Sequence, residues 1–131
     1  MVKTISIKTA AREQMIDVTA EVEAAVAASG VLDGIAVVQS AHTTAAVTVN
    51  ENADPDVRHD LLHWLRTRIP QADEFRHAEG NSDAHLKTSL FGASQTLIVE
   101  DGKLLLGQWQ GIFLAEFDGP RTRRIHVQVL G

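Results

Sequence analysis

Residues 96–129, TLIVEDGKLLLGQWQGIFLAEFDGPRTRRIHVQV, decide the fold class of this chain. Asp101 and Gly102 separate two short apolar runs, a spacing typical of a two-residue β-hairpin. A second hairpin is predicted where residues 112–117 return, through a turn rich in Asp, Gly and Pro, into residues 124–129. Hairpin connections are too short for a parallel crossover, so the sheets are expected to be antiparallel.

The first part of the chain predicts strands around one amphipathic helix. Residues 2–8 are rich in β-branched side chains and indicate a first strand, and a second short strand is expected to end near Ile16. Asp17 is a candidate N-cap for a helix whose apolar residues recur at helical spacing up to Gly30. The remaining strands of this part are predicted at residues 35–38 and 47–50.

A second helix is predicted to begin after Asp54, which caps it, with Pro55 in its first position. Pro70 is expected to end this helix. Residues 71–86 show no hydrophobic periodicity. This absence predicts a long polar loop, of the kind that is usually functional or mobile. Residues 1–131 are therefore expected to form one α+β domain with two main helices and largely antiparallel, sandwich-like sheets.

Composition excludes several classes of protein. The chain has 12 Lys and Arg against 17 Asp and Glu, a net charge of −5, which disfavours a nucleic-acid binder that relies on neutralising phosphates. It has no cysteine, so disulfides, thiolate metal sites and cysteine nucleophiles are excluded. No apolar run approaches the roughly 18 residues of a membrane span, and no signal-peptide core is visible, so the expected location is the cytoplasm.

Six histidines and no tyrosine are the unusual feature of the composition. His59 and His63 share one face of the second predicted helix, but that face is otherwise charged, which favours a solvated surface over a metal-ligand pair. His42, His77 and His85 lie at a strand end and in the polar loop. They could hold a divalent metal with an open position for water or substrate, although spacing alone favours hydrogen-bonded surface histidines.

Arginines concentrate in one short segment. Arg121, Arg123 and Arg124 lie within four positions of an acidic chain. Guanidinium groups match the oxygens of phosphates and carboxylates, so the segment is either an anion site or only a turn between strands. Trp109, in a glycine-flanked polar segment, either stacks on a flat ligand or covers the core, and composition favours the core.

Five motifs, taken in their order and separation, resemble the YjbQ family, which is described as secondary thiamine-phosphate synthase. They are His42-Thr43-Thr44-Ala45-Ala46, residues 50–57 (NENADPDV), Gly80-Asn81 with Ala84-His85, Gly107-Gln108-Trp109-Gln110, and residues 116–121 (EFDGPR). The resemblance covers nearly the whole chain. It departs at Gln108, where the family usually has threonine.

The resemblance implies a homotrimer with a polar pocket near the subunit boundaries. It implies metal ligands at His42, His77 and His85 for a divalent metal, zinc being the first choice and magnesium an alternative that would accompany a diphosphate. It implies catalytic groups at Glu51, Asp118 and Arg121. It implies substrate contacts at Thr43, Thr44, Asn50, Asn81, Trp109, Gln110 and Arg124. It also implies that Arg121 and Arg124 together form an anion clamp.

The activity implied by the resemblance joins a pyrimidine methyl diphosphate to a thiazole phosphate and releases diphosphate. The expected partner is thus a small phosphorylated molecule rather than a nucleic acid or a membrane, and the native substrate can be a different phosphorylated compound. The alternative is a non-catalytic protein, either a metal-binding trimeric assembly or a ligand-binding protein. A metal with no open coordination position would favour that alternative.

Overall fold

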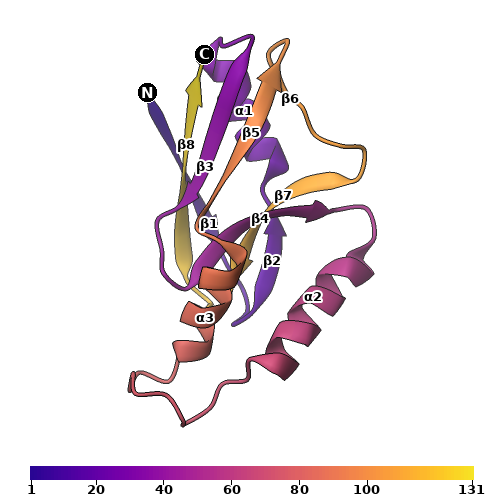
Figure 1. Cartoon of the computed structure of the whole chain (residues 1–131). Helices are drawn as coiled ribbons and strands as arrows, with labels where there is room; N and C mark the ends of the chain where they lie inside the picture. The colour runs from indigo at the N-terminus through magenta and orange to yellow at the C-terminus, as the bar shows by residue number, and fades with distance from the viewer.

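A computed structural model describes all residues 1–131 and shows eight strands and three helices (Figure 1). In chain order they are β1 (Val2–Lys8), β2 (Gln14–Asp17), α1 (Thr19–Ser29), β3 (Gly34–Ser40), β4 (Ala45–Glu51), α2 (Pro55–Arg68), α3 (Ser82–Phe91), β5 (Ser94–Glu100), β6 (Lys103–Leu104), β7 (Gln110–Glu116) and β8 (Thr122–Leu130). They form a five-stranded sheet, β1-β8-β3-β5-β6, and a three-stranded sheet, β2-β7-β4. Every strand pair is antiparallel, which confirms the α+β class.

Strand β7 lies at the centre of the smaller sheet because both of its faces are apolar. Ile112 and Leu114 face the larger sheet and α1, within the main core cluster. Phe113 and Ala115 face the opposite way, into a second cluster with Leu65 of α2 and residues of α3. The molecule is therefore layered, with α2 and α3 on the outer side of the smaller sheet at one end (Figure 1).

The hairpin at Asp101 and Gly102 is confirmed, but the second predicted hairpin was wrong. Asp101 and Gly102 have φ values of 52° and 75°, and left-handed values at both positions are what a type I′ turn requires. Strand β7 pairs with β2 and β4, whereas β8 pairs with β1 and β3. The turn at Asp118 thus carries the chain from one sheet to the other, because β7 needs cover on both faces and β8 on only one.

The predicted polar loop is shorter than expected, because α3 begins at Ser82. The helix has no apolar period to read from the sequence, since its inward face carries Asp83 and Lys87, each 1% exposed. These charges lie at i and i+4 and pair with each other at 2.8 Å. In the sequence alone, a helix face that carries charges looks solvated, because the buried partners of those charges are not visible there.

The ends of the other helices follow local chemistry closely. The carboxylate of Asp54 accepts from the Asp56 N–H at 2.9 Å at the start of α2, as predicted. Gly30 ends α1 with a φ of 72°. Asp17 is the last residue of β2 rather than the N-cap of α1, although its carboxylate accepts from the Thr19 N–H at 2.9 Å.

Candidate functional site

The turn after β7 meets the start of α3 through the side chain of Asp118. Its Oδ2 accepts from Asn81 Nδ2 at 2.8 Å and from Arg121 Nη2 at 2.9 Å. Arg121 Nε also donates to the Asp118 carbonyl at 2.7 Å. Three of the predicted site residues, distant in sequence, are therefore joined in one hydrogen-bonded group, and the Arg121 guanidinium is already partly neutralised.

A fully buried ion pair lies beneath this group. Arg123 donates from Nε to both carboxylate oxygens of Glu116, at 2.8 and 3.0 Å, and from Nη2 to the Thr44 hydroxyl at 2.8 Å. Glu116 also accepts from the hydroxyl of Thr9 and the N–H of Asp118. Arg123 and Thr44 thus support the turn from inside, and the hydroxyl predicted to contact substrate is committed to Arg123.

The three clustered arginines consequently have three different environments. Strand alternation places Arg123 on the same inward face of β8 as Ile125 and Val127, a signal that was present in the sequence. Arg124, on the opposite face, is exposed, and its guanidinium has no hydrogen-bond or ion-pair partner within the chain. Arg124 is therefore the arginine of the cluster that remains free to bind an anion.

His42 lies just after the end of β3 and contacts the start of β8. Its Nε2 accepts a hydrogen bond of 2.8 Å from the backbone N–H of Arg124. Burial lowers the pKa of His42, and the positive charges of Arg123 and Arg124 lower it further. His42 is thus a neutral imidazole in a positively charged environment.

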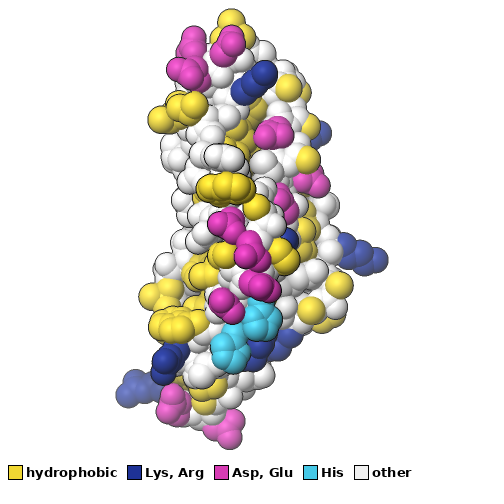
Figure 2. Space-filling view, turned by 90° about the vertical axis from the view of Figure 1, so that its right-hand side faces the viewer, with side chains coloured by type: hydrophobic (Ala, Val, Ile, Leu, Met, Phe, Trp, Pro, Cys, Tyr) yellow, Lys and Arg dark blue, Asp and Glu magenta, His cyan; other side chains and the backbone are white.

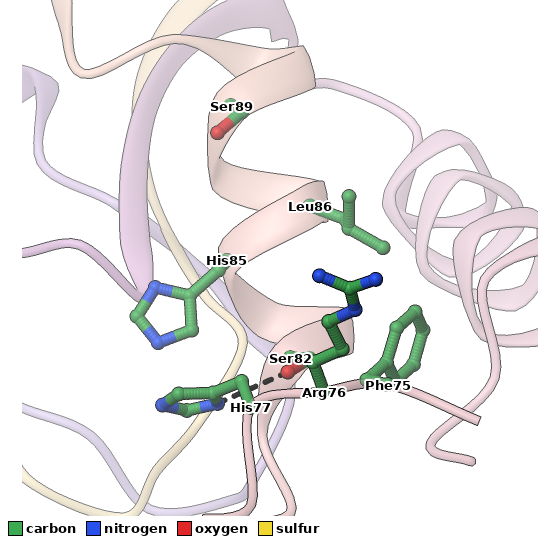
Figure 3. A pocket seen from close by; sticks show the side chains of 7 residues that line it. All are labelled: Phe75, Arg76, His77, Ser82, His85, Leu86 and Ser89. Carbon is green, nitrogen blue, oxygen red and sulfur yellow. Dashed lines mark hydrogen bonds between the residues drawn. The ribbon is translucent and has the colours of Figure 1, made fainter. Parts of the chain in front are cut away.

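His77 and His85 are brought together at the start of α3 (Figure 3). Their rings meet edge to face with centroids 5.2 Å apart, and His77 Nδ1 lies 3.0 Å from the Ser82 hydroxyl. The two histidines, with Arg76 and Ser82, line an open pocket of about 410 Å³. His85 comes from the helix and His77 from the loop before it.

The three histidines predicted as metal ligands do not fit together as a metal site. No three His, Asp or Glu side chains gather closely enough to hold a metal ion. His42 has no free lone pair, because a neutral imidazole that accepts at Nε2 carries its proton on Nδ1. A metal ion bound by His77 and His85 would need further ligands from outside this group of residues.

A second group of predicted site residues lies at the far end of β4. Glu51 and Asn50 are the last residues of β4 and pair with Gln110 and Gly111 of β7. Since Thr44 precedes the first residue of β4, the strand separates the two groups by about 20 Å at 3.3 Å per residue. One chain therefore does not bring Glu51 together with the Asp118 group.

The side chains of this second group are fixed by short-range contacts. Glu51 Oε2 accepts from the Asp54 N–H at 3.2 Å, and Gln110 Oε1 accepts from the Gly107 N–H at 2.8 Å. Gly111 is required beside them, since an added Cβ would lie 2.5 Å from Asn52 Nδ2. Trp109 is 56% exposed, so the interpretation that it covers the core was wrong.

A buried charge network next to the Asp118 group was missed by the sequence analysis. Asp83 accepts from both Nη atoms of Arg12, at 3.1 and 3.0 Å, and from Lys87 Nζ at 2.8 Å. Lys87 also donates to Glu13 at 3.1 Å. Burial alone raises the pKa of Asp83, but the hydrogen bonds from Arg12 and Lys87 outweigh it and lower the pKa. The i, i+4 spacing of Asp83 and Lys87 was the available signal.

The solvated interpretation of His59 and His63 is confirmed. Both are exposed on α2, and their rings stack with centroids 6.1 Å apart. His59 contacts Asp60, and the two side chains are 73% and 79% exposed. Figure 2 shows two histidine side chains next to each other, beside acidic ones, on the side of the molecule where α2 lies.

The fold and the site define a small α+β protein with a histidine- and arginine-bearing polar surface. No helix is long and apolar enough to cross a membrane. The family model described as UPF0047 protein YjbQ-like matches residues 3–131, so the chain belongs to the YjbQ/UPF0047 family.

Relatives support this assignment over nine-tenths or more of their length. A UPF0047 protein of Methanocaldococcus jannaschii is 56% identical over 95% of this chain and 91% of its own. YugU of Bacillus subtilis, also named a UPF0047 protein, is 52% identical over 100% of both chains.

Solved structures agree with the fold. A YjbQ/UPF0047 family protein from Clostridium acetobutylicum, 52% identical, superposes with a TM-score of 0.96 over 98% of this chain and 99% of its own. A Sulfolobus solfataricus protein described as YbjQ-like and of unknown function, 36% identical, gives a TM-score of 0.96 over 100% of this chain and 96% of its own. These descriptions establish the family and state no activity.

Proposed function

We propose that the protein is a transferase that acts on small phosphorylated molecules, with thiamine-phosphate synthase-like activity. The observation that carries the proposal is the exposed, unpaired Arg124, which follows the Asp118–Arg121 group in the chain by three residues. Guanidinium groups match the oxygens of a diphosphate, and this acidic chain has few basic side chains that are not needed to balance its carboxylates. The native substrate can be a different phosphorylated compound.

In the proposed reaction the bond between the pyrimidine methylene carbon and the diphosphate oxygen breaks, and diphosphate leaves with the electron pair. The thiazole nitrogen donates its lone pair to that carbon, which forms the new C–N bond of thiamine phosphate. Arg124 and Arg121 stabilise the negative charge on the leaving group, and Asp118 orients Arg121. Asn81, held by Asp118, is a substrate-positioning group.

The separation of the predicted residues into two groups supports assembly of the site between copies of the chain. In the proposed homotrimer, Glu51, Asn50, Gln110 and Trp109 of one copy complete the surface around Asp118 of the next. Trp109 then stacks on a heterocycle, which suits an aromatic side chain that is 56% exposed in the single chain. Light scattering after size exclusion should give a mass three times that of the chain.

A divalent cation stays a prediction for this site. Zinc would suit the imidazoles of His77 and His85, whereas magnesium would arrive with a diphosphate. No step of the proposed reaction depends on either metal.

The test is to supply the purified protein with the pyrimidine methyl diphosphate and the thiazole phosphate and to measure thiamine phosphate. Wild type should form product faster than Arg124→Gln, whereas His59→Ala on α2 should match wild type. Product formation no faster than in the Arg124→Gln variant would exclude this activity.

A ligand-binding protein without catalysis is the second candidate. It is favoured by the number of charges already paired inside the chain, including Arg123 with Glu116 and Lys87 with Asp83. Stoichiometric binding of a phosphorylated heterocycle with no turnover would favour this candidate.

A further inference from the structure

An unusual pair of hydrogen bonds joins the residues just after the end of β3 to the start of β8. The Ala41 N–H donates to the Arg124 carbonyl at 3.1 Å, and the Arg124 N–H donates to His42 Nε2 at 2.8 Å. An imidazole nitrogen thus takes the place of the strand carbonyl that would normally receive the Arg124 N–H. This position gives His42 a structural bond on one ring nitrogen only.

The bond determines which ring nitrogen of His42 carries the proton. Because Nε2 accepts from an N–H, its lone pair is occupied, and the proton of the neutral ring is on Nδ1. Nδ1–H has no acceptor within the chain. His42 therefore offers an unused hydrogen-bond donor and no lone pair for a metal.

The charges around His42 favour a negative ligand. Arg121 is paired with Asp118 and Arg123 with Glu116, so the two carboxylates leave the positive charge of Arg124 uncompensated. The Arg121, Arg123 and Arg124 charges all act on His42 in the direction that disfavours added positive charge, against an opposing effect of Glu116. The same charges would repel a divalent cation at this position.

We propose that His42 and Arg124 form an anion-binding subsite in which His42 donates from Nδ1–H and does not ligate a metal. The ligand is a phosphate or diphosphate group, an identity that rests on the proposed function. The Arg124 guanidinium supplies the charge and the His42 ring supplies a neutral donor. This role departs from the three-histidine metal site that the sequence resemblance implies.

The tautomer can be measured directly. Long-range ¹H–¹⁵N spectra of ¹⁵N-histidine-labelled protein at pH 7.5 should show His42 protonated at Nδ1. One equivalent of zinc should leave both His42 nitrogens unshifted, whatever it does to His77 and His85. A His42 protonated at Nε2, or a His42 nitrogen that moves to a metal-bound shift, would overturn the proposal.

Anion binding is tested separately, on metal-free protein, with inorganic pyrophosphate as the probe in calorimetry. Arg124→Gln and His42→Leu should each weaken binding about tenfold, the usual effect of losing one charge-assisted hydrogen bond. Glutamine at 42 keeps an oxygen that can accept the Arg124 N–H and an N–H that can donate to the anion, so His42→Gln should bind more tightly than His42→Leu. His59→Gln on α2 is the matched control and should bind like wild type.

The outcomes separate the two proposals. Pyrophosphate binding that is unchanged in both variants overturns the subsite, and with it the anion-binding role of Arg124 on which the proposed function rests. No pyrophosphate binding by wild type overturns both. Binding weakened by Arg124→Gln but not by His42→Leu rejects the donor role of His42 and leaves the proposed function standing.

Discussion

Replacing Asp83 by asparagine should destabilise the fold by about 3 kcal/mol, near the lower end of the loss seen when a buried ion pair loses one partner. Asp83 is 1% exposed and accepts three hydrogen bonds, two from Arg12 and one from Lys87. Lys87 is equally buried and would keep only Glu13 as a charged partner. The Arg12 side chain is 31% exposed and can turn to water, which limits the loss.

The assay is urea unfolding followed by far-UV circular dichroism, at one fixed protein concentration because assembly would add to stability. Asp60→Asn on α2, where Asp60 is 79% exposed, is the matched control and should change stability by less than about 0.5 kcal/mol. Asp83→Leu combined with Lys87→Met should recover part of the loss, since no buried charge is left unpaired. An Asp83→Asn variant within about 1 kcal/mol of wild type would refute the network as a stabilising element.

Three further predictions concern other parts of the molecule. Burial and neighbouring positive charges lower the pKa of His42, so the unfolded state binds the proton more readily than the folded state, and stability is lost as the pH falls below about 6.5. The difference between the urea midpoints at pH 7.5 and pH 5.5 should therefore be smaller in His42→Gln than in wild type. An equal difference in the two proteins would contradict this account. Gly102→Ala should cost about 1 kcal/mol because the residue has a φ of 75°, and thermal unfolding of the variant against wild type measures it. Trp109→Ala should leave monomer stability nearly unchanged, since the ring is 56% exposed, but lower thiamine phosphate formation; a large loss in urea stability would show that the ring belongs to the core instead.

Individual site residues could be chosen from the sequence, but their roles depended on partners. Arg121, Arg123 and Arg124 are indistinguishable as a cluster, yet one is paired at the surface, one is buried and one is free. Strand alternation could have separated Arg123 from its neighbours, because it shares a face with Ile125. Nothing in the order of residues shows that the lone pair of a histidine 82 positions away is occupied by the Arg124 N–H.

Local chemistry in the sequence was sufficient to determine the antiparallel α+β class, the hairpin at Asp101-Gly102 and the start of α2 at Asp54-Pro55. Each depends on the backbone preferences of adjacent residues, which act before the chain folds. Only the tertiary structure decided that β7 and β8 enter different sheets, that α3 turns Asp83 and Lys87 inward, and that the site residues form two groups. These outcomes depend on which surfaces become buried together and which distant charges pair, and such contacts exist only after folding.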